Sequence, residues 1–209
     1  QAATGVPAVS LGGSAAAQFT ITANSCTAVL AGNATCTVGV AFRPTVRGGQ
    51  TASLGVTASP GGTAAASLSG TGLMQATLVG STTTFNFGTV DVTRSSAAQT
   101  LTVRNSGDVA SSALTLASTG NPGDFGVSNV SCTGTLAAGA SCTVRIVFSP
   151  TVGGARSLTT TVSASTGGSA RVVSSGTGRA LSVLTVTPAG SGTGTVTSVP
   201  TGISCGADC

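Results

Sequence analysis

Apolar and polar residues alternate in short segments along most of this 209-residue chain. From Cys142 to Phe148 every second residue is apolar, while Thr143 and Arg145 occupy positions between them. Residues two apart share one face of a β-strand, so this segment is predicted to be a strand with one buried and one exposed face. The segment from Cys36 to Phe42 shows the same alternation. We therefore expect a protein built from β-strands.

Turn sequences rich in glycine, asparagine and serine separate seven predicted strands in the middle of the chain. The first carries Phe85 and Phe87 on one face and is expected to break at Gly88. The seven strands are predicted at Ala76 to Val90, Gln99 to Asn105, Ala113 to Ser118, Phe125 to Val130, Cys142 to Phe148, Ser157 to Ala164 and Ala170 to Ser175. Short strands at such intervals, with almost no helical period, are typical of an immunoglobulin-like β-sandwich.

The chain contains one sequence pattern twice. Cys26, Cys36, Phe42 and Gly70 recur 106 residues later as Cys132, Cys142, Phe148 and Gly176. A period of this size corresponds to a whole small domain rather than to a solenoid turn. We expect tandem all-β modules: an incomplete one at 1–73 that lacks its first strands, a complete one at 74–179, and the start of a third small β module at 180–209.

The same offset aligns Gln1 with Gly107, so the first copy has no counterpart of residues 76–106. A sandwich without these strands would expose a sheet edge and apolar surface. Either the sequence is a window from a longer protein, or a neighbouring subunit donates a strand. The first explanation is favoured because the tail also ends within a module. The donor candidate for the second is Leu181 to Val199, which lacks the paired phenylalanines.

The six cysteines form three local pairs, which are Cys26 with Cys36, Cys132 with Cys142, and Cys205 with Cys209. Zinc binding is the competing interpretation, but the pairs lie in separate modules and histidine is absent. Disulfides are therefore favoured. Each of the two longer bridges would close a loop of about ten residues and contribute about 2 to 3 kcal/mol. Disulfides predict an oxidising compartment and a secreted protein.

Composition excludes several classes of function. All eight cations are arginines, all four anions are aspartates, and the chain has no Lys, Glu, His, Trp or Tyr. General acid–base catalysis mostly uses residue types that are missing here, so no enzyme, no catalytic residue, no metal site and no cofactor is expected. The aspartates are predicted to form turns and to bond nearby backbone. They are Asp91, Asp108, Asp124 and Asp208.

The arginines are spread along the chain and form no basic stripe, so nucleic acid is not expected as a partner. Most of them are predicted to be solvated, with a minority contacting adjacent modules. The group comprises Arg43, Arg47, Arg145, Arg156 and Arg171. No apolar run approaches the roughly 20 residues of a membrane span, so insertion of this segment into a membrane is not expected.

Five segments of the second copy together carry a resemblance to a known family. They are Phe85 to Val90, Leu101 to Gly107, Cys132 to Cys142, Val147 to Thr151 and Ser175 to Gly178. This combination resembles the bacterial choice-of-anchor D and ASH-type family, covering Ala76 to Gly178 well and Ala8 to Gly72 in part. The resemblance implies an immunoglobulin-like sandwich that repeats in secreted and surface proteins, without catalytic residues. The tail, Leu181 to Cys209, resembles the opening of a divergent internalin-type B repeat.

Together these features predict a structural repeat segment of a secreted bacterial cell-surface or extracellular filament protein. It would act as a spacer and assembly module, and its partners would be copies of itself or neighbouring modules, including strand donation between subunits. The alternatives are an adhesin module that binds host protein or glycan, or an accessory domain of a larger secreted enzyme. The loops considered for adhesion are Ser118 to Asp124 and Thr45 to Gln50.

Overall fold

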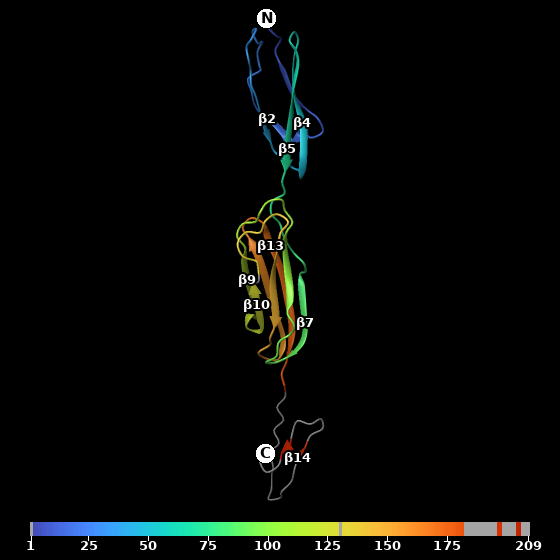
Figure 1. Ribbon diagram of the computed structural model, residues 1–209, viewed down its shortest axis with the longest axis vertical. Helices are drawn as coiled ribbons and strands as arrows, with labels where there is room; N and C mark the ends of the chain where they lie inside the picture. The colour runs from blue at the N-terminus through green and yellow to red at the C-terminus, as the bar shows by residue number, and fades with distance from the viewer. Residues whose placement is uncertain (1, 130, 182–195, 198–203, 206–209) are drawn as a thin grey trace.

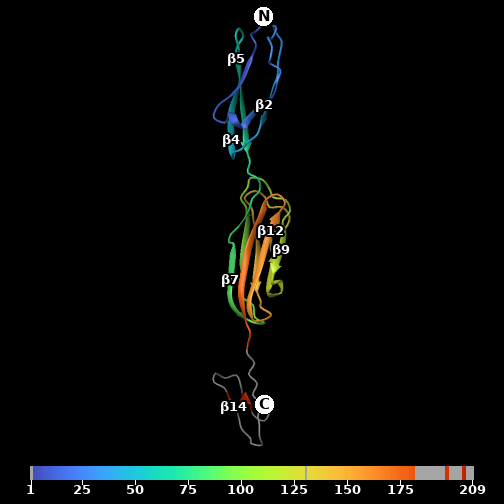
Figure 2. The ribbon, with the colours of Figure 1, turned by 180° about the vertical axis from the view of Figure 1, so that it is seen from behind.

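The computed structural model describes residues 2–129, 131–181, 196–197 and 204–205. Two β modules follow one another along the long axis of the molecule (Figure 1), and the view from behind shows the same order (Figure 2). We call residues 2–73 the first module and residues 74–179 the second module. No helix in the described ranges is long and apolar enough to cross a membrane.

The second module is a sandwich of two four-stranded sheets, which confirms the predicted immunoglobulin-like architecture. One sheet has the order β10-β11-β8-β6 and the other the order β7-β13-β12-β9. Every pairing is antiparallel except that of β7 with β13. The strands are β6 (Leu78–Gly80), β7 (Thr84–Asp91), β8 (Gln99–Asn105), β9 (Thr115–Gly120), β10 (Phe125–Asn129), β11 (Ser141–Phe148), β12 (Gly154–Ala164) and β13 (Gly168–Arg179).

The predicted single strand from Ala76 to Val90 was wrong, because this stretch forms two strands, β6 and β7, in different sheets. The chain has to change sheets so that Leu78 and Phe85 both reach the core from opposite sides. Gly88 does not end β7 but lies inside it with a φ of 66°. The side chain of Asn86 accepts a hydrogen bond from the Gly88 N–H at 2.9 Å, and the pairing with β13 shifts register there.

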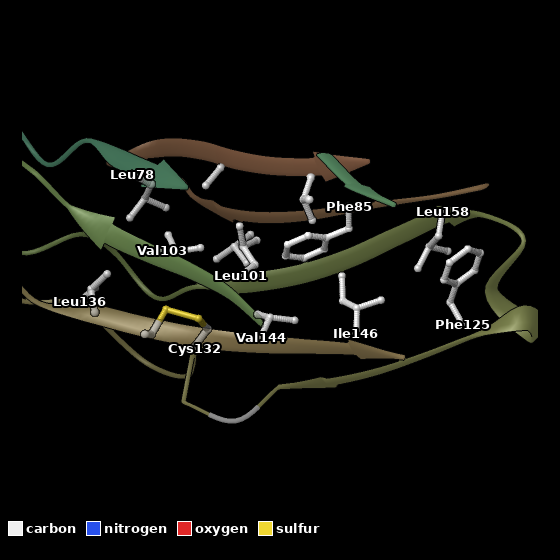
Figure 3. Packing of buried hydrophobic residues seen from close by; sticks show 14 of the residues in the cluster. Leu78, Phe85, Leu101, Val103, Phe125, Cys132, Leu136, Val144, Ile146 and Leu158 are labelled. Atoms are coloured by element: carbon white, nitrogen blue, oxygen red, sulfur yellow. A yellow bond between two sulfur atoms is a disulfide. The ribbon is translucent and has the colours of Figure 1, made fainter. Parts of the chain in front are cut away.

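The core of the second module lies between the two sheets (Figure 3). Strand β11 alternates as predicted, with Val144, Ile146 and Phe148 fully buried and Arg145 exposed. The two sheets supply the other fully buried apolar side chains, which are Leu101, Val103, Leu158, Val162 and Val172. Burial of these apolar surfaces is the main stabilising contribution to the sandwich.

The first module repeats part of this plan. It has a three-stranded sheet of order β1-β4-β5 and a two-stranded sheet of β2 and β3. These strands are β1 (Ala8–Gly12), β2 (Phe19–Asn24), β3 (Val38–Phe42), β4 (Gly48–Ala58) and β5 (Gly62–Gly72). The offset of 106 residues places them on β9, β10, β11, β12 and β13 respectively. The described residues of the first module contain no counterpart of β6, β7 or β8.

Disulfides join Cys26 to Cys36 and Cys132 to Cys142, with S–S distances of 2.02 and 2.07 Å. The local bridges expected at these two pairs are therefore present. Beyond the second module, β14 (Val196–Thr197) pairs antiparallel with β15 (Ser204–Cys205). The predicted bridge from Cys205 to Cys209, most of the donor candidate Leu181 to Val199, and most of the third module lie outside the described residues.

Candidate functional site

The junction between the two modules brings together side chains that the sequence separates widely. Residues 73–77 connect the end of β5 to the start of β6. Leu73 and Met74 are largely exposed, whereas Ala76, within the second module, is buried. A connection this short limits the distance between the modules but does not by itself fix their orientation.

Asp108 connects the second module to both the linker and the first module. Its Oδ2 accepts a hydrogen bond from the Met74 N–H at 2.9 Å, and its own N–H donates to the Met74 carbonyl, also at 2.9 Å. Its Oδ1 forms an ion pair with the Arg47 guanidinium of the first module. The Met74 N–H, and after it the Arg47 guanidinium, lower the pKa of the Asp108 carboxyl below its ordinary value. The carboxylate is therefore ionised at neutral pH and keeps its two contacts, with the Met74 N–H and the Arg47 guanidinium.

Asn105 fixes the loop that carries Asp108. Its side chain is fully buried, and its Oδ1 accepts hydrogen bonds from the N–H groups of Thr77 and Gly107, both at 3.0 Å. Its Nδ2 donates to the carbonyls of Val109 and Leu136 at 2.8 and 3.0 Å. One amide thus ties the linker, its own turn and a distant loop together. Buried polar groups of this kind are stable only when they are paired in this way.

The turn needs glycine at position 107. A Cβ at Gly107 would lie 2.2 Å from the Gln75 carbonyl oxygen and 2.7 Å from the Ala76 Cα. No side chain fits there while the linker follows this path. Ser106 donates its N–H to the Thr77 carbonyl at 2.8 Å, which holds the linker against the turn. We call residues 105–108 the junction turn.

The loop that presents Arg47 is also held in place. Gln18 Oε1 accepts hydrogen bonds from the N–H and the hydroxyl of Thr45, at 2.6 and 3.1 Å. In the second module Asp124 does the same for Thr151, with both distances at 2.7 Å. Both copies therefore tie the loop after β3 or β11 to the turn before β2 or β10. The first copy uses this device to place a guanidinium at the junction.

The side chains of Asp108 and Asp124 do bond backbone N–H groups, as predicted, but these belong to Met74 and Thr151 and not to their own turns. Asp108, Asp124 and Asp91 each form an ion pair with an arginine that is distant in the sequence. The pairs of Asp124 with Arg156 and of Asp91 with Arg179 have N···O distances of 3.1 and 2.5 Å. Turn composition predicts where a loop lies, but it does not show which loops meet in space. Asp208 lies outside the described residues.

A minority of the arginines was expected to contact an adjacent module, and Arg47 makes such a contact. Arg43, Arg145 and Arg171 are exposed as predicted, whereas Arg156 is mostly covered beside Asp124. Asn105 was missed as a site residue, because the sequence showed only a turn composition. Its place at the end of a strand, two residues before an obligatory glycine, was the available signal.

The junction can bind and orient, and it contains no nucleophile paired with a base. Within the described residues there is no group of three or more side chains of the types that hold a metal ion. The groups that meet at the junction are one carboxylate, one guanidinium and a set of backbone hydrogen bonds.

Comparison with protein families matches residues 76–175 to the HYDIN/CFA65/VesB-like, Ig-like domain. This match agrees with the observed sandwich and identifies that part of the chain as an immunoglobulin-like domain. The resemblance to choice-of-anchor D repeats and to an internalin-type repeat stays a prediction. A comparison with curated proteins finds no match.

Three solved structures illustrate the fold similarity. PapD-like (ASH) domain 7 of human CEP192 is 16% identical with a TM-score of 0.41, covering 52% of this chain and 89% of that one. The secreted serine protease VesC from Vibrio cholerae is 24% identical with a TM-score of 0.35, covering 44% of this chain and 21% of that one. Domains 4 and 5 of the S-layer protein SbsC are 14% identical with a TM-score of 0.32, covering 77% and 70%. This chain thus matches only about a fifth of the VesC protease.

Proposed function

We propose that this chain is a structural spacer of a secreted protein, in which a bonded joint sets the direction from one sandwich to the next. The observation that carries the proposal is the set of contacts that Asp108 makes with the linker and with Arg47. A flexible tether between independent domains would need none of these contacts. The partners of this chain are the neighbouring modules of the array, and the chain performs no catalysis.

The two disulfides support an extracellular setting. Each closes a short loop within its own module, at a separation of 10 residues. Such bridges persist in oxidising compartments and are rare in reducing ones. Each of these two bridges stabilises its own module and does not cross the junction. The contacts described across the junction are hydrogen bonds and an ion pair.

The alternative role as an adhesin is less well supported, because both loops considered for it are engaged internally. The loop from Thr45 to Gln50 contributes Arg47 to the junction and is tied to Gln18. In the loop from Ser118 to Asp124, the aspartate is buried and paired with Arg156. An accessory role in a larger enzyme is compatible with a spacer, since a spacer can also position a catalytic domain.

The experiment is to measure residual dipolar couplings of both modules in the intact chain. The spacer proposal expects one alignment tensor to fit both modules, because a fixed joint makes them tumble together. Asp108→Ala is expected to reduce the tensor magnitude of one module relative to the other. Asp91→Ala is the matched control, because it removes an aspartate–arginine pair that does not involve the junction.

Two results would overturn the proposal. One is that the unmodified chain already needs two tensors of different magnitude. The other is that Asp108→Ala leaves the single tensor intact while the amide spectra show that both modules remain folded.

A further inference from the structure

A groove lies on the outer face of the sheet that contains β6, β8 and β11. Its volume is ≈ 320 Å³, and its lining includes Val79, Arg104 and Ser141. Strand pairing places these three residues in one row across the sheet, because Val79 is opposite Arg104 and Arg104 is opposite Ser141. Ligand pockets in proteins begin at about 300 Å³, so this groove has room for a small molecule. We call it the β6 groove.

Arg104 is a cation that the protein does not neutralise. Its Nε donates a hydrogen bond to the Gly139 carbonyl at 3.3 Å, and within the described residues it forms no ion pair. Three of the four aspartates are paired with other arginines. A guanidinium stays charged and presents its N–H donors in a planar fork that matches a carboxylate. A bound carboxylate would therefore give Arg104 the partner that the chain does not supply.

Hydroxyl groups beside Arg104 are free to bond the same anion. Ser141 lies opposite Arg104, and Thr102 lies two residues before it on the same face of β8. Neither hydroxyl has a hydrogen-bond partner among the residues that the structure describes. Each can donate its proton to an oxygen of the anion. The β6 groove thus offers one positive charge and two hydroxyl donors at one end.

Val79 makes the other side of the groove apolar. Its side chain is 49% exposed, and it is the large apolar side chain that the strands of the second module leave most open. Neighbouring strands lie about 4.8 Å apart, so an anion held at Arg104 brings the carbons attached to it over Val79. Covering Val79 removes apolar surface from water, which favours a ligand with an apolar body.

Other kinds of ligand fit the β6 groove less well. An added β-strand needs free backbone groups along the edge of β6, but the Leu78 N–H already donates to the Gly167 carbonyl at 2.8 Å. A chain of anions needs several cations, and Arg104 is the one charged residue that lines the groove. A phosphate monoester would bring a second negative charge beside Val79 without a partner. The groove therefore matches a single carboxylate.

We propose that the β6 groove binds a small organic monocarboxylate with a branched apolar body. The Arg104 guanidinium forms an ion pair with the carboxylate, and the hydroxyls of Ser141 and Thr102 donate hydrogen bonds to its oxygens. The apolar body covers Val79. This site is separate from the pair of Arg47 and Asp108, so the proposal does not rest on the proposed function.

The test is to titrate the intact chain with isocaproate at constant ionic strength and to follow the amide chemical shifts. Saturable shifts are expected at Val79, Arg104 and Ser141, with a dissociation constant of about 1 to 10 mM for so small a ligand. Arg104→Gln is expected to weaken binding by at least about tenfold, because the charge-assisted bonds are lost. Arg145→Gln is the matched control and should bind as the parent does. Arg145 lies on the same face of the sheet and also lacks an ion pair, but it does not line the groove.

Two further ligands separate the charge from the apolar body. Isocaproamide has the same body without the charge, and acetate has the charge without the body. Each is expected to bind at least about tenfold more weakly than isocaproate. Val79→Ser should weaken the binding of isocaproate and leave that of acetate unchanged, because the substitution removes only the apolar contact.

Three results would overturn the proposal. The first is equal affinity of the parent and a folded Arg104→Gln variant for isocaproate. The second is equal binding of acetate and isocaproate, since the apolar side of the groove would then contribute nothing. The third is tighter binding of hexa-aspartate at the same amides, which would make this face a docking surface for an acidic protein. None of these results bears on the dipolar couplings that test the joint.

Discussion

Asn105→Ala tests the most specific claim about the junction, that one buried amide holds the junction turn. The substitution removes five hydrogen bonds, two accepted by Oδ1 and three donated by Nδ2. Their costs differ. The Gly107 N–H is buried and would lose the partner described for it, which costs about 1 to 3 kcal/mol. The Thr77 N–H belongs to an exposed residue, so water can replace its partner.

The substitution costs less at the carbonyls of Leu136 and Ala137, because each keeps a second hydrogen bond. Leu136 also accepts a hydrogen bond from the Ser111 N–H at 2.9 Å, and Ala137 accepts one from the Ala140 N–H at 3.1 Å. With a small packing defect added at a fully buried site, the free energy of unfolding of the second module is expected to fall by about 2 to 4 kcal/mol. For a module of about 100 residues this lowers the melting temperature by at least about 8 °C.

The assay is thermal unfolding of the intact chain by differential scanning calorimetry, with Asn121→Ala as the matched control. Asn121 is exposed, and its side chain accepts one hydrogen bond from the Ser157 N–H at 3.0 Å. The control is expected to cost no more than about 1 kcal/mol. Equal melting temperatures for the two variants would refute the claim that burial and multiple bonding make Asn105 the anchor of the turn.

Three further predictions concern the second module. Gly176→Ala should destabilise it by about 1 to 3 kcal/mol in urea unfolding, because the new Cβ would lie 2.6 Å from the buried Phe148 ring; a neutral effect would contradict the packing. Hydrogen bonds from the Thr151 N–H and hydroxyl are the main cause of the lowered pKa of Asp124. The stabilising contribution of the Asp124 carboxylate is therefore complete above about pH 4 and is lost as the pH falls through the depressed pKa. The urea midpoint should drop over that pH range, and it should drop less in Asp124→Asn. Replacing Cys132 and Cys142 together by serine should cost about 2 to 3 kcal/mol; if the non-reduced parent and the variant unfold at the same urea concentration, the bridge does not stabilise the module.

The sequence by itself determined the strand content, the repeat and the two described disulfides. Alternation from Cys142 to Phe148 reflects local geometry, since each residue turns its side chain to the opposite face from the last. The spacing of Cys26 and Cys36 keeps the partners close along the chain, so few alternative pairings compete. A repeat of 106 residues needs no structure to be seen.

Only the tertiary structure decided where those elements meet. The stretch from Ala76 to Val90 was predicted as one extended segment, and it divides because the two sheets require side chains from opposite directions. Arg47 and Asp108 are separated by 61 residues, and no periodicity links them. Val79 likewise lies beside Arg104 only because β6 pairs with β8, and its exposure is a property of neighbours in space and not of the sequence that supplies the side chain.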